Sequence, residues 1–151
     1  MNDVGERRQW RAEFDREDKL ADDFARARRD QRRAAQRPAC AVADIGSYLA
    51  AQREAVFHLV IAADVFAYVA DIADVCAAVK RVLSTGGLFA FTVETHDGDG
   101  AIVGAKMRYA HGEPFIRDAL GDAGLTLVEL AHASSRTENR MPVPGLLVVA
   151  R

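Results

Sequence analysis

Three apolar runs of strand length each end in an acidic residue: Asp44, Asp64 and Glu94. In a sheet of parallel strands the carboxyl ends lie along one edge, and ligands bind there. An ionised carboxylate accepts strong hydrogen bonds from N–H donors where water is partly excluded. The pattern therefore predicts a ligand-binding edge supplied with acids. Two simpler roles stay open, because Asp44 could cap the helix that follows it and Asp64 could be a turn residue.

The elements that would position these acids alternate between strands and helices. Apolar runs predict strands over residues 39–44, 57–64, 88–94, 125–133 and 145–151. The run 57–64 is apolar almost throughout, as a strand buried on both faces requires. Residues 139–144 are too few for a crossover helix, so the last two strands are predicted to pair antiparallel.

Helices are predicted between these strands. A short helix passes through Tyr48 and Leu49, a second starts after Asp71 as its N-cap and stops at 84–87, and a third covers 115–123. Strands alternating with helices imply a parallel sheet with helices on both faces and right-handed crossovers. The glycine-rich stretch 95–114 is predicted to be a long loop at the carboxyl end of a strand, a place that often carries function.

Composition bounds the class of protein. The chain has 151 residues, half of them hydrophobic, and a formal charge of −2, as one soluble domain with a core would have. It lacks an apolar stretch of about eighteen residues, and its first residues are charged, so a cytoplasmic protein without signal peptide or membrane span is predicted. Cys40 and Cys76 are predicted to be buried, inert thiols, without a disulfide framework or a zinc site.

The first 38 residues differ in character from the rest of the chain. They are rich in Arg and Asp, and their apolar residues Trp10, Phe14, Ala21 and Phe24 recur at helical spacing. We predict a charged helical extension over 1–38, which could be a solvated helix, a coiled-coil partner or a helix lying across the domain. Nucleic-acid binding is not predicted, because acidic residues are interleaved with the basic ones.

Three sequence segments, in this order, resemble those of a known family: FHLVIAADVFAYVADI (57–72), VKRVLSTGGLFAFTVE (79–94) and RYAHGEPFIRDALGDAGL (108–125). They resemble the Rossmann-like class I S-adenosylmethionine-dependent methyltransferases, most closely the predicted methyltransferases that often accompany tetratricopeptide repeats. The resemblance implies that 39–151 is the C-terminal part of such a domain. It implies a partial doubly wound, mostly parallel sheet that ends in an antiparallel hairpin, with S-adenosylmethionine as cofactor.

The resemblance also implies which residues would hold the cofactor. It makes Asp44 the acceptor for the adenine amino group and puts the Ile45 backbone beside the adenine ring. A second group would pass beneath the methionine end of the cofactor at the sheet edge: Ala62, Ala63, Asp64 and Val65.

On the acceptor side, the resemblance points to Glu94, Arg108, Tyr109 and His111 as catalytic candidates lining the pocket above the methyl group. They could orient a nucleophile or accept its proton, and His111 has the ordinary pKa nearest neutrality. The alternative is a solvated loop without chemistry. The methyl acceptor itself is not predicted.

One departure from the family limits these implications. Class I methyltransferases usually begin with a strand and a glycine-rich turn of the type GxGxG, whereas this chain offers only Gly5 before Asp44. Neither that turn nor the acid for the ribose hydroxyls can be placed, and the chain reads as truncated. Without the first strands, the strand 57–64 would expose an apolar edge, which the N-terminal helix, a second copy or a partner chain would cover.

Three functional hypotheses follow. The first is a methyltransferase that is active only when a partner or a missing segment completes its site. The second is a catalytically inactive fragment of the same fold, or a partner-binding module. The missing glycine-rich turn discriminates between the first hypothesis and the second. The third is an unrelated α/β binding domain, because a fold alone does not establish a function.

Overall fold

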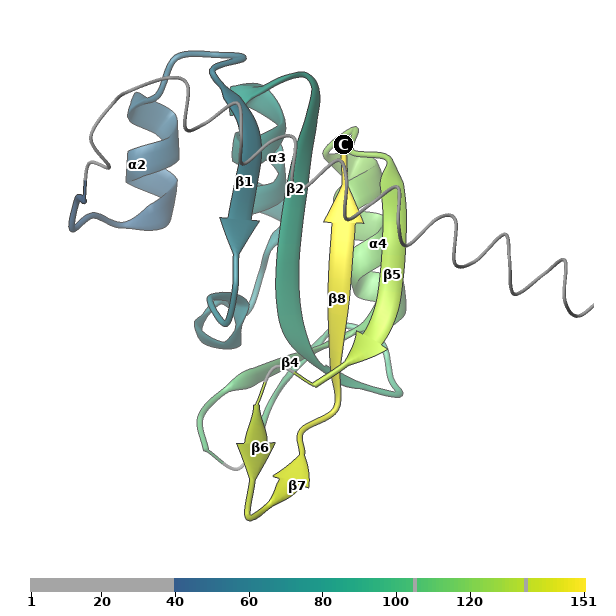
Figure 1. Ribbon diagram of the computed structural model, residues 1–151. Helices are drawn as coiled ribbons and strands as arrows, with labels where there is room; N and C mark the ends of the chain where they lie inside the picture. The colour runs from purple at the N-terminus through teal and green to yellow at the C-terminus, as the bar shows by residue number, and fades with distance from the viewer. Residues whose placement is uncertain (1–39, 105, 135) are drawn as a thin grey trace, which may run out of the picture. The chain divides into compact units, whose positions relative to one another are not determined.

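The computed structural model describes residues 40–104, 106–134 and 136–151 (Figure 1). Every helix and strand described below belongs to the unit Val42–Arg151. The predicted helical extension over 1–38 lies outside the described residues.

A mixed β-sheet with the long strand β2 at its centre forms the framework (Figure 1). Its strands are β1 (Phe57–Ala62), β2 (Leu83–His96), β3 (Ala101–Val103), β4 (Tyr109–Gly112), β5 (Leu127–Ala133) and β8 (Gly145–Ala150). β2 pairs parallel with β1 and β4 and antiparallel with β8, which in turn pairs antiparallel with β5. The α/β class and the terminal antiparallel pair are confirmed. A separate small hairpin joins β6 (Thr137–Glu138) and β7 (Met141–Pro142).

The stretch 95–114 is not the single long loop that its glycines predict. β3 and β4 pair antiparallel within it, and β4 then adds to the end of β2. The hairpin is possible because the glycines allow close backbone approach: a Cβ on Gly112 would lie 2.0 Å from the Gly98 carbonyl oxygen. This hairpin gives the sheet a larger antiparallel share than the sequence predicts.

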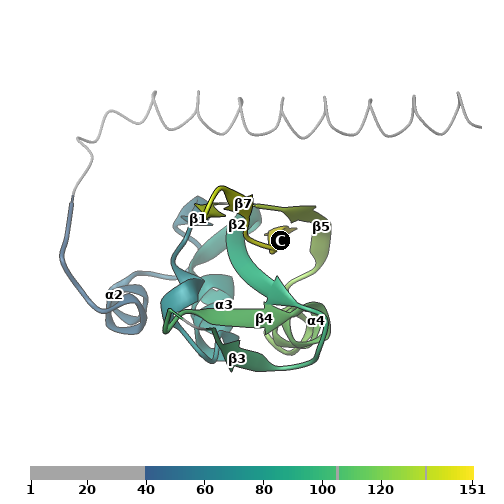
Figure 2. The ribbon, with the colours of Figure 1, turned by 90° about the horizontal axis from the view of Figure 1, so that it is seen from below.

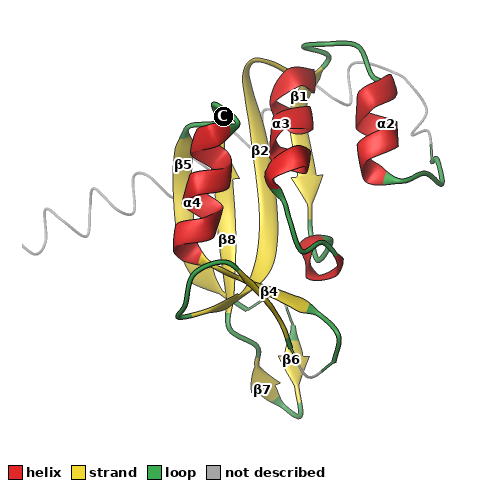
Figure 3. Cartoon of the chain, turned by 180° about the vertical axis from the view of Figure 1, so that it is seen from behind, coloured by secondary structure: helices red, strands yellow, loops and turns green. Residues whose placement is uncertain are grey.

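The helices are α2 (Ile45–Ala51), the 3₁₀ turn η1 (Phe66–Tyr68), α3 (Ala73–Val82) and α4 (Glu113–Asp122). α3 and α4 cover the same face of the sheet, and α2 packs against α3 (Figures 2 and 3). Helices on both faces were predicted, and for the described residues this is wrong. β1, β2 and β5 run parallel to one another and follow in this order across the sheet, so right-handed crossovers place α3 and α4 on the same side.

The helix ends follow local chemistry. Asp71 was predicted to be the N-cap of α3, but the N-cap is Ile72. The Asp71 carboxylate, one position earlier, accepts from the Ala73 N–H at 2.9 Å. Beyond α4, Gly124 takes a φ of +70°, and the Leu125 N–H returns to the Leu120 carbonyl at 2.8 Å. α3 instead passes directly into β2 at Leu83, and the Gly-Gly turn lies within that strand.

Residues 40–44 form no strand, contrary to the prediction for 39–44. A strand needs a hydrogen-bonded neighbour, and the described part of the chain offers none there. Val42 is fully exposed and the Cys40 thiol is exposed, so the prediction of a buried Cys40 is wrong. Cys76 is buried as predicted, and burial raises the pKa of its thiol to about 12.

β1 is an edge strand in the part of the sheet that the structure describes. It pairs with β2 alone, and Ile61 is 62% exposed, so the prediction of burial on both faces is wrong here. Among the described strands, the outer edge of β1 is therefore unpaired.

Candidate functional site at the carboxyl ends of β1 and β2

The chain leaves β1 through an unusual backbone conformation at Asp64. Its φ is +57°, in the left-handed region where aspartate is one of the few residues found besides glycine. The Asp64 N–H donates to Thr92 Oγ1 on β2 at 3.0 Å, which fastens the turn to the neighbouring strand. Asp64 is therefore a turn residue in geometry, and because its backbone makes this bond its side chain is left to pair at the sheet edge.

The Arg108 guanidinium gathers groups from three segments at this edge. Its Nε donates to Glu94 Oε1 at 2.5 Å and its Nη1 donates to the Tyr68 hydroxyl at 2.8 Å. Its Nη2 donates to Asp64 Oδ1, and the guanidinium carbon lies 5.0 Å from the centre of the Tyr68 ring. We call Asp64, Tyr68, Glu94 and Arg108 the Arg108 cluster. Three of these four residues were candidates from the sequence.

A second arginine completes the pairing of Glu94. Arg136 Nε donates to Glu94 Oε1 at 2.8 Å, and its Nη1 donates to Glu138 Oε2 at 3.2 Å. Lys106 Nζ lies 2.8 Å from Glu138 Oε1. Sequence reasoning missed Tyr68 and this outer group. The alternation of Arg136 and Glu138 in an extended segment puts both on one side, but nothing in the sequence aims that segment at Glu94.

Glu94 is held as a carboxylate. Its side chain is only 12% exposed, and burial, the largest single influence, raises its pKa. Hydrogen bonds from Arg136 and Arg108 outweigh burial and leave the pKa of Glu94 below its ordinary value. A carboxylate with a lowered pKa is a weak base, so Glu94 fixes arginines more readily than it accepts a proton.

Asp44 lies at the N-terminus of α2, and this helix end and the end of β1 lie at the same edge of the molecule (Figure 1). The Ser47 N–H donates to Asp44 Oδ1 at 2.9 Å, a hydrogen bond that lowers the pKa of this exposed carboxyl group. The capping role that the sequence left open is therefore present. Ile45 begins the helix directly after it.

The segment from Ala62 to Val65 runs along this edge. Ala62 is buried at the end of β1, Ala63 and Asp64 are exposed, and Val65 is half-buried. The two exposed residues of this segment lie at the carboxyl edge, where the resemblance puts the methionine end of a cofactor.

His111 and Tyr109 do not join the Arg108 cluster. Tyr109 begins β4 opposite Val103 and is half-buried. The His111 ring is 0% exposed, and its Nε2 lies 2.9 Å from the Val69 carbonyl oxygen. Placing His111 in the open lining of a pocket is wrong, because alternation along β4 turns its ring into the protein interior.

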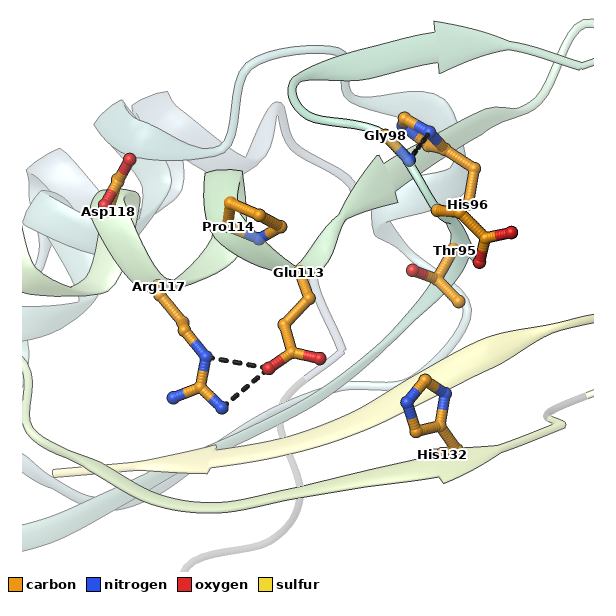
Figure 4. Close-up of a pocket in the computed structure, with 9 residues that line it drawn as sticks. Thr95, His96, Gly98, Glu113, Pro114, Arg117, Asp118 and His132 are labelled. Atoms are coloured by element: carbon orange, nitrogen blue, oxygen red, sulfur yellow. Dashed lines mark hydrogen bonds and ion pairs between the residues drawn. The ribbon is translucent and has the colours of Figure 1, made fainter.

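A separate polar pocket of about 550 Å³ lies between the end of β2, the first turns of α4 and His132 on β5 (Figure 4). Arg117 and Glu113 pair across one turn of α4 at its mouth, with 2.8 Å between Nε and Oε1. Thr95 lines this pocket, and because successive residues of a strand alternate, Glu94 faces the other way. The pocket and the Arg108 cluster are therefore distinct.

Among the described residues no group of three or more His, Cys, Asp or Glu side chains is arranged to hold a metal ion. None of the helices of the described ranges is long and apolar enough to cross a bilayer.

Several solved structures with this fold are S-adenosylmethionine-dependent methyltransferases. A methyltransferase from Leishmania major aligns with a TM-score of 0.57 and 14% identity, covering 72% of this chain and 43% of its own. The 1,6-didemethyltoxoflavin-N1-methyltransferase from Burkholderia thailandensis, solved with S-adenosylhomocysteine, gives 0.58 and 18%, covering 74% of this chain and 49% of its own. The chain thus spans about half the length of these proteins.

The fold carries more than one chemistry. The [4+2]-cyclase SpnF aligns with a TM-score of 0.60 and 16% identity, covering 87% of this chain and 60% of its own. At such identities a structural likeness establishes the fold alone.

Sequence comparison establishes the family. No curated protein matches the sequence. The family model described as "Methyltransferase domain" matches residues 16–91, half of the chain, and so takes in β1, α3 and most of β2. The chain therefore belongs to the methyltransferase domain family.

Proposed function

We propose that this chain is the cofactor-edge and acceptor-side part of an S-adenosylmethionine-dependent methyltransferase, active once its cofactor site is completed. The observation that supports it most is the Arg108 cluster. It brings Asp64 from the end of β1 and Glu94 from the end of β2 together at the edge where doubly wound sheets bind ligands. The family membership of residues 16–91 gives the proposal its chemistry.

The residues present fit one part of the cofactor. Asp44 uses Oδ1 for the Ser47 N–H, which leaves the rest of an exposed carboxylate to accept from the adenine amino group. The exposed turn at Ala63 and Asp64 leaves room for the methionine end. A glycine-rich turn of the family type is absent from residues 40–104, 106–134 and 136–151, so a partner chain or a further segment would supply it.

When bound, S-adenosylmethionine supplies an electrophilic methyl group on a sulfonium. The chain's own contribution is alignment of the acceptor. The Tyr68 hydroxyl accepts from Arg108 and keeps its own proton for donation, and Asp64 is 51% exposed at its side chain and keeps a second carboxylate oxygen. Glu94 is a weak base and would not readily take a proton from the methyl acceptor. The favoured acceptor is therefore one whose attacking atom already has an available lone pair and need not be deprotonated first.

One alternative has an observation in its favour. All three guanidinium nitrogens of Arg108 are used within the protein, and the outer edge of β1 is unpaired among the described strands. This arrangement also suits a catalytically inactive member of the fold that binds a partner chain or a second copy at β1.

Calorimetric titration of the full chain with S-adenosylmethionine and S-adenosylhomocysteine tests the proposal. We expect micromolar binding that weakens about tenfold or more in Asp44→Ala, since a hydrogen bond to a charged group contributes roughly 1.5–3 kcal/mol. Asp44→Ser keeps an N-cap acceptor and removes the charge, so it separates capping from adenine recognition. Asp122→Ala, at the C-terminal end of α4, removes another exposed carboxylate, and as the matched control it should bind as the unaltered chain does.

Two results would count against parts of the proposal. Absence of binding at high micromolar cofactor would overturn cofactor binding by this chain alone and leave either an inactive fragment of the fold or a subunit that binds cofactor only together with a partner. Normal binding by Asp44→Ser would confine Asp44 to capping α2.

A further inference from the structure

His111 is the one buried polar or charged residue among those the structure describes. It lies in β4 with a side chain that is 0% exposed, and it belongs neither to the Arg108 cluster nor to the residues that line the polar pocket. An ionisable ring in such a place needs partners for its polar atoms, because an unpaired buried polar group costs free energy.

The ring joins three elements. Its Nε2 lies 2.9 Å from the carbonyl oxygen of Val69, in the connection between β1 and α3 (residues 63–72). It stacks on the Phe115 ring of α4, with 5.9 Å between ring centres and 16° between planes. Its own backbone carbonyl accepts from Thr95 Oγ1 of β2 at 2.8 Å. His111 thus ties the connection 63–72 to the sheet and to α4.

These contacts define the protonation state. A carbonyl oxygen can only accept, so Nε2 carries the proton and the Nδ1 of a neutral ring presents a lone pair. Nδ1 is buried and has no hydrogen-bond partner among the described residues. Adding a proton there would create a buried charge and a buried N–H without an acceptor.

The surroundings offer this charge little compensation. Burial lowers the pKa of His111 most, the Val69 and Ala70 carbonyls act in the opposite direction, and His96 of β2 lowers it further. The group facing the ring from α4 is the uncharged Phe115, and Ala101 lies opposite His111 in β3. No carboxylate of the described residues stabilises the imidazolium form.

We propose that His111 is a positioning residue: in its neutral form it latches the connection 63–72 to β4 and α4, and so holds Asp64 and Tyr68 against Arg108. The connection supplies two of the four members of the Arg108 cluster, and the latch fastens it near its middle. The latch itself stands without the proposed function. Only its consequence for methyl transfer rests on that function.

The sign of the pH effect follows from linkage. The folded pKa lies below the ordinary value of 6.5, so the latched state binds fewer protons than the released state in the interval between the two values. The latch is fully effective above pH 6.5 and weakens as the pH falls below it. Since release takes up one proton, the opening constant of the connection rises by up to tenfold per pH unit within that interval.

Hydrogen exchange of the full chain between pH 7.5 and 5, corrected for intrinsic rates, tests the latch. We expect opening of 63–72 to increase as the pH falls while amides of β8 keep their protection. His111→Gln retains an N–H donor that does not titrate, so opening should become independent of pH. His111→Leu loses the donor, so opening should rise roughly fivefold to tenfold at pH 7.5. His132→Gln, at an exposed histidine, should behave as the unaltered chain does.

Nitrogen chemical shifts of the ring give a second readout. They should show the Nε2–H tautomer for His111 at pH 7.5. Either an Nδ1–H tautomer or equal opening of 63–72 and β8 at low pH would overturn the latch, as would unchanged pH dependence in His111→Gln. Cofactor titration of His111→Leu then tests the consequence separately: raised opening of 63–72 with unaltered binding would leave the latch intact and count against its consequence for methyl transfer. Absence of binding by the unaltered chain would count against the proposed function and leave the latch untouched.

Discussion

Arg108→Ala is expected to lower the free energy of unfolding by about 3 kcal/mol, because it removes the shared partner of three groups. The Arg108 side chain is 13% exposed and that of Glu94 is 12% exposed, so much of this pair is shielded from water. Without Arg108, Glu94 keeps Arg136 alone, and Asp64 loses the contact that aims its side chain. Urea unfolding of the full chain at pH 7, followed by circular dichroism, measures the loss.

Matched variants separate the cluster from ordinary surface charge. Arg108→Lys keeps the charge but loses the planar fork that reaches three acceptors, so an intermediate loss is expected. Arg117→Ala breaks the exposed pair with Glu113 and should cost no more than about 0.5 kcal/mol. If Arg108→Ala costs no more than Arg117→Ala, the Arg108 cluster is not a stabilising unit.

Acid sensitivity should change in the same variant. Burial raises the pKa of Glu94, but the two arginines together lower it by more, so the pKa lies below its ordinary value. A depressed carboxyl pKa stabilises the fold above the ordinary value, and that contribution disappears as the pH falls through the lowered one. Arg108→Ala removes part of the cause, and its stability should therefore fall less steeply between neutral and acidic pH.

Much of the framework is predictable because its signals are local. The apolar run at 57–64, the periodic residues from Val75 to Val82 and the glycine after α4 each fix one element by hydrophobic period or turn chemistry. The antiparallel pairing of β5 and β8 follows from the shortness of the segment that joins them, which leaves no room for a crossover helix. Asp64 and Glu94 could be predicted to meet, because carboxyl ends of parallel strands share an edge.

The errors arise where a residue's partner is distant in sequence. Residues 40–44 have strand composition, yet strand formation depends on a neighbour that the described residues do not contain. The β3–β4 hairpin is hidden by glycines, which signal loops and close packing alike. The sequence alone places His111 in an exposed loop, because its inward-facing position can be recognised only once β4 is known to be a strand. The contact of Arg136 with Glu94 joins residues 42 positions apart, and no local pattern signals it.

Phe91→Ala is expected to cost about 3–5 kcal/mol, the range for removing a buried aromatic side chain. Phe91 is 1% exposed and lies between Phe66 and Phe89, with ring centres 5.2 Å and 4.7 Å away. In the sheet it lies between Ala62 of β1 and Val148 of β8, so the cavity left by the substitution would lie against the three central strands. Such a loss is a large part of the total stability of an ordinary domain, roughly 5–15 kcal/mol.

Two other variants test whether the loss of stability arises from packing of the Phe91 ring against β2's neighbours in the core. Phe91→Leu fills part of the cavity and should lose clearly less, while Val128→Ala, at a residue of β5 that is 42% exposed, should change stability by about 0.5 kcal/mol or less. Thermal and urea unfolding of the three chains rank them directly. A Phe91→Ala midpoint close to that of Val128→Ala would mean that the three phenylalanines do not form the centre of the core. Because Thr92 and Glu94 extend from the opposite face of this strand, that outcome would also remove the rigid support on which the Arg108 cluster depends.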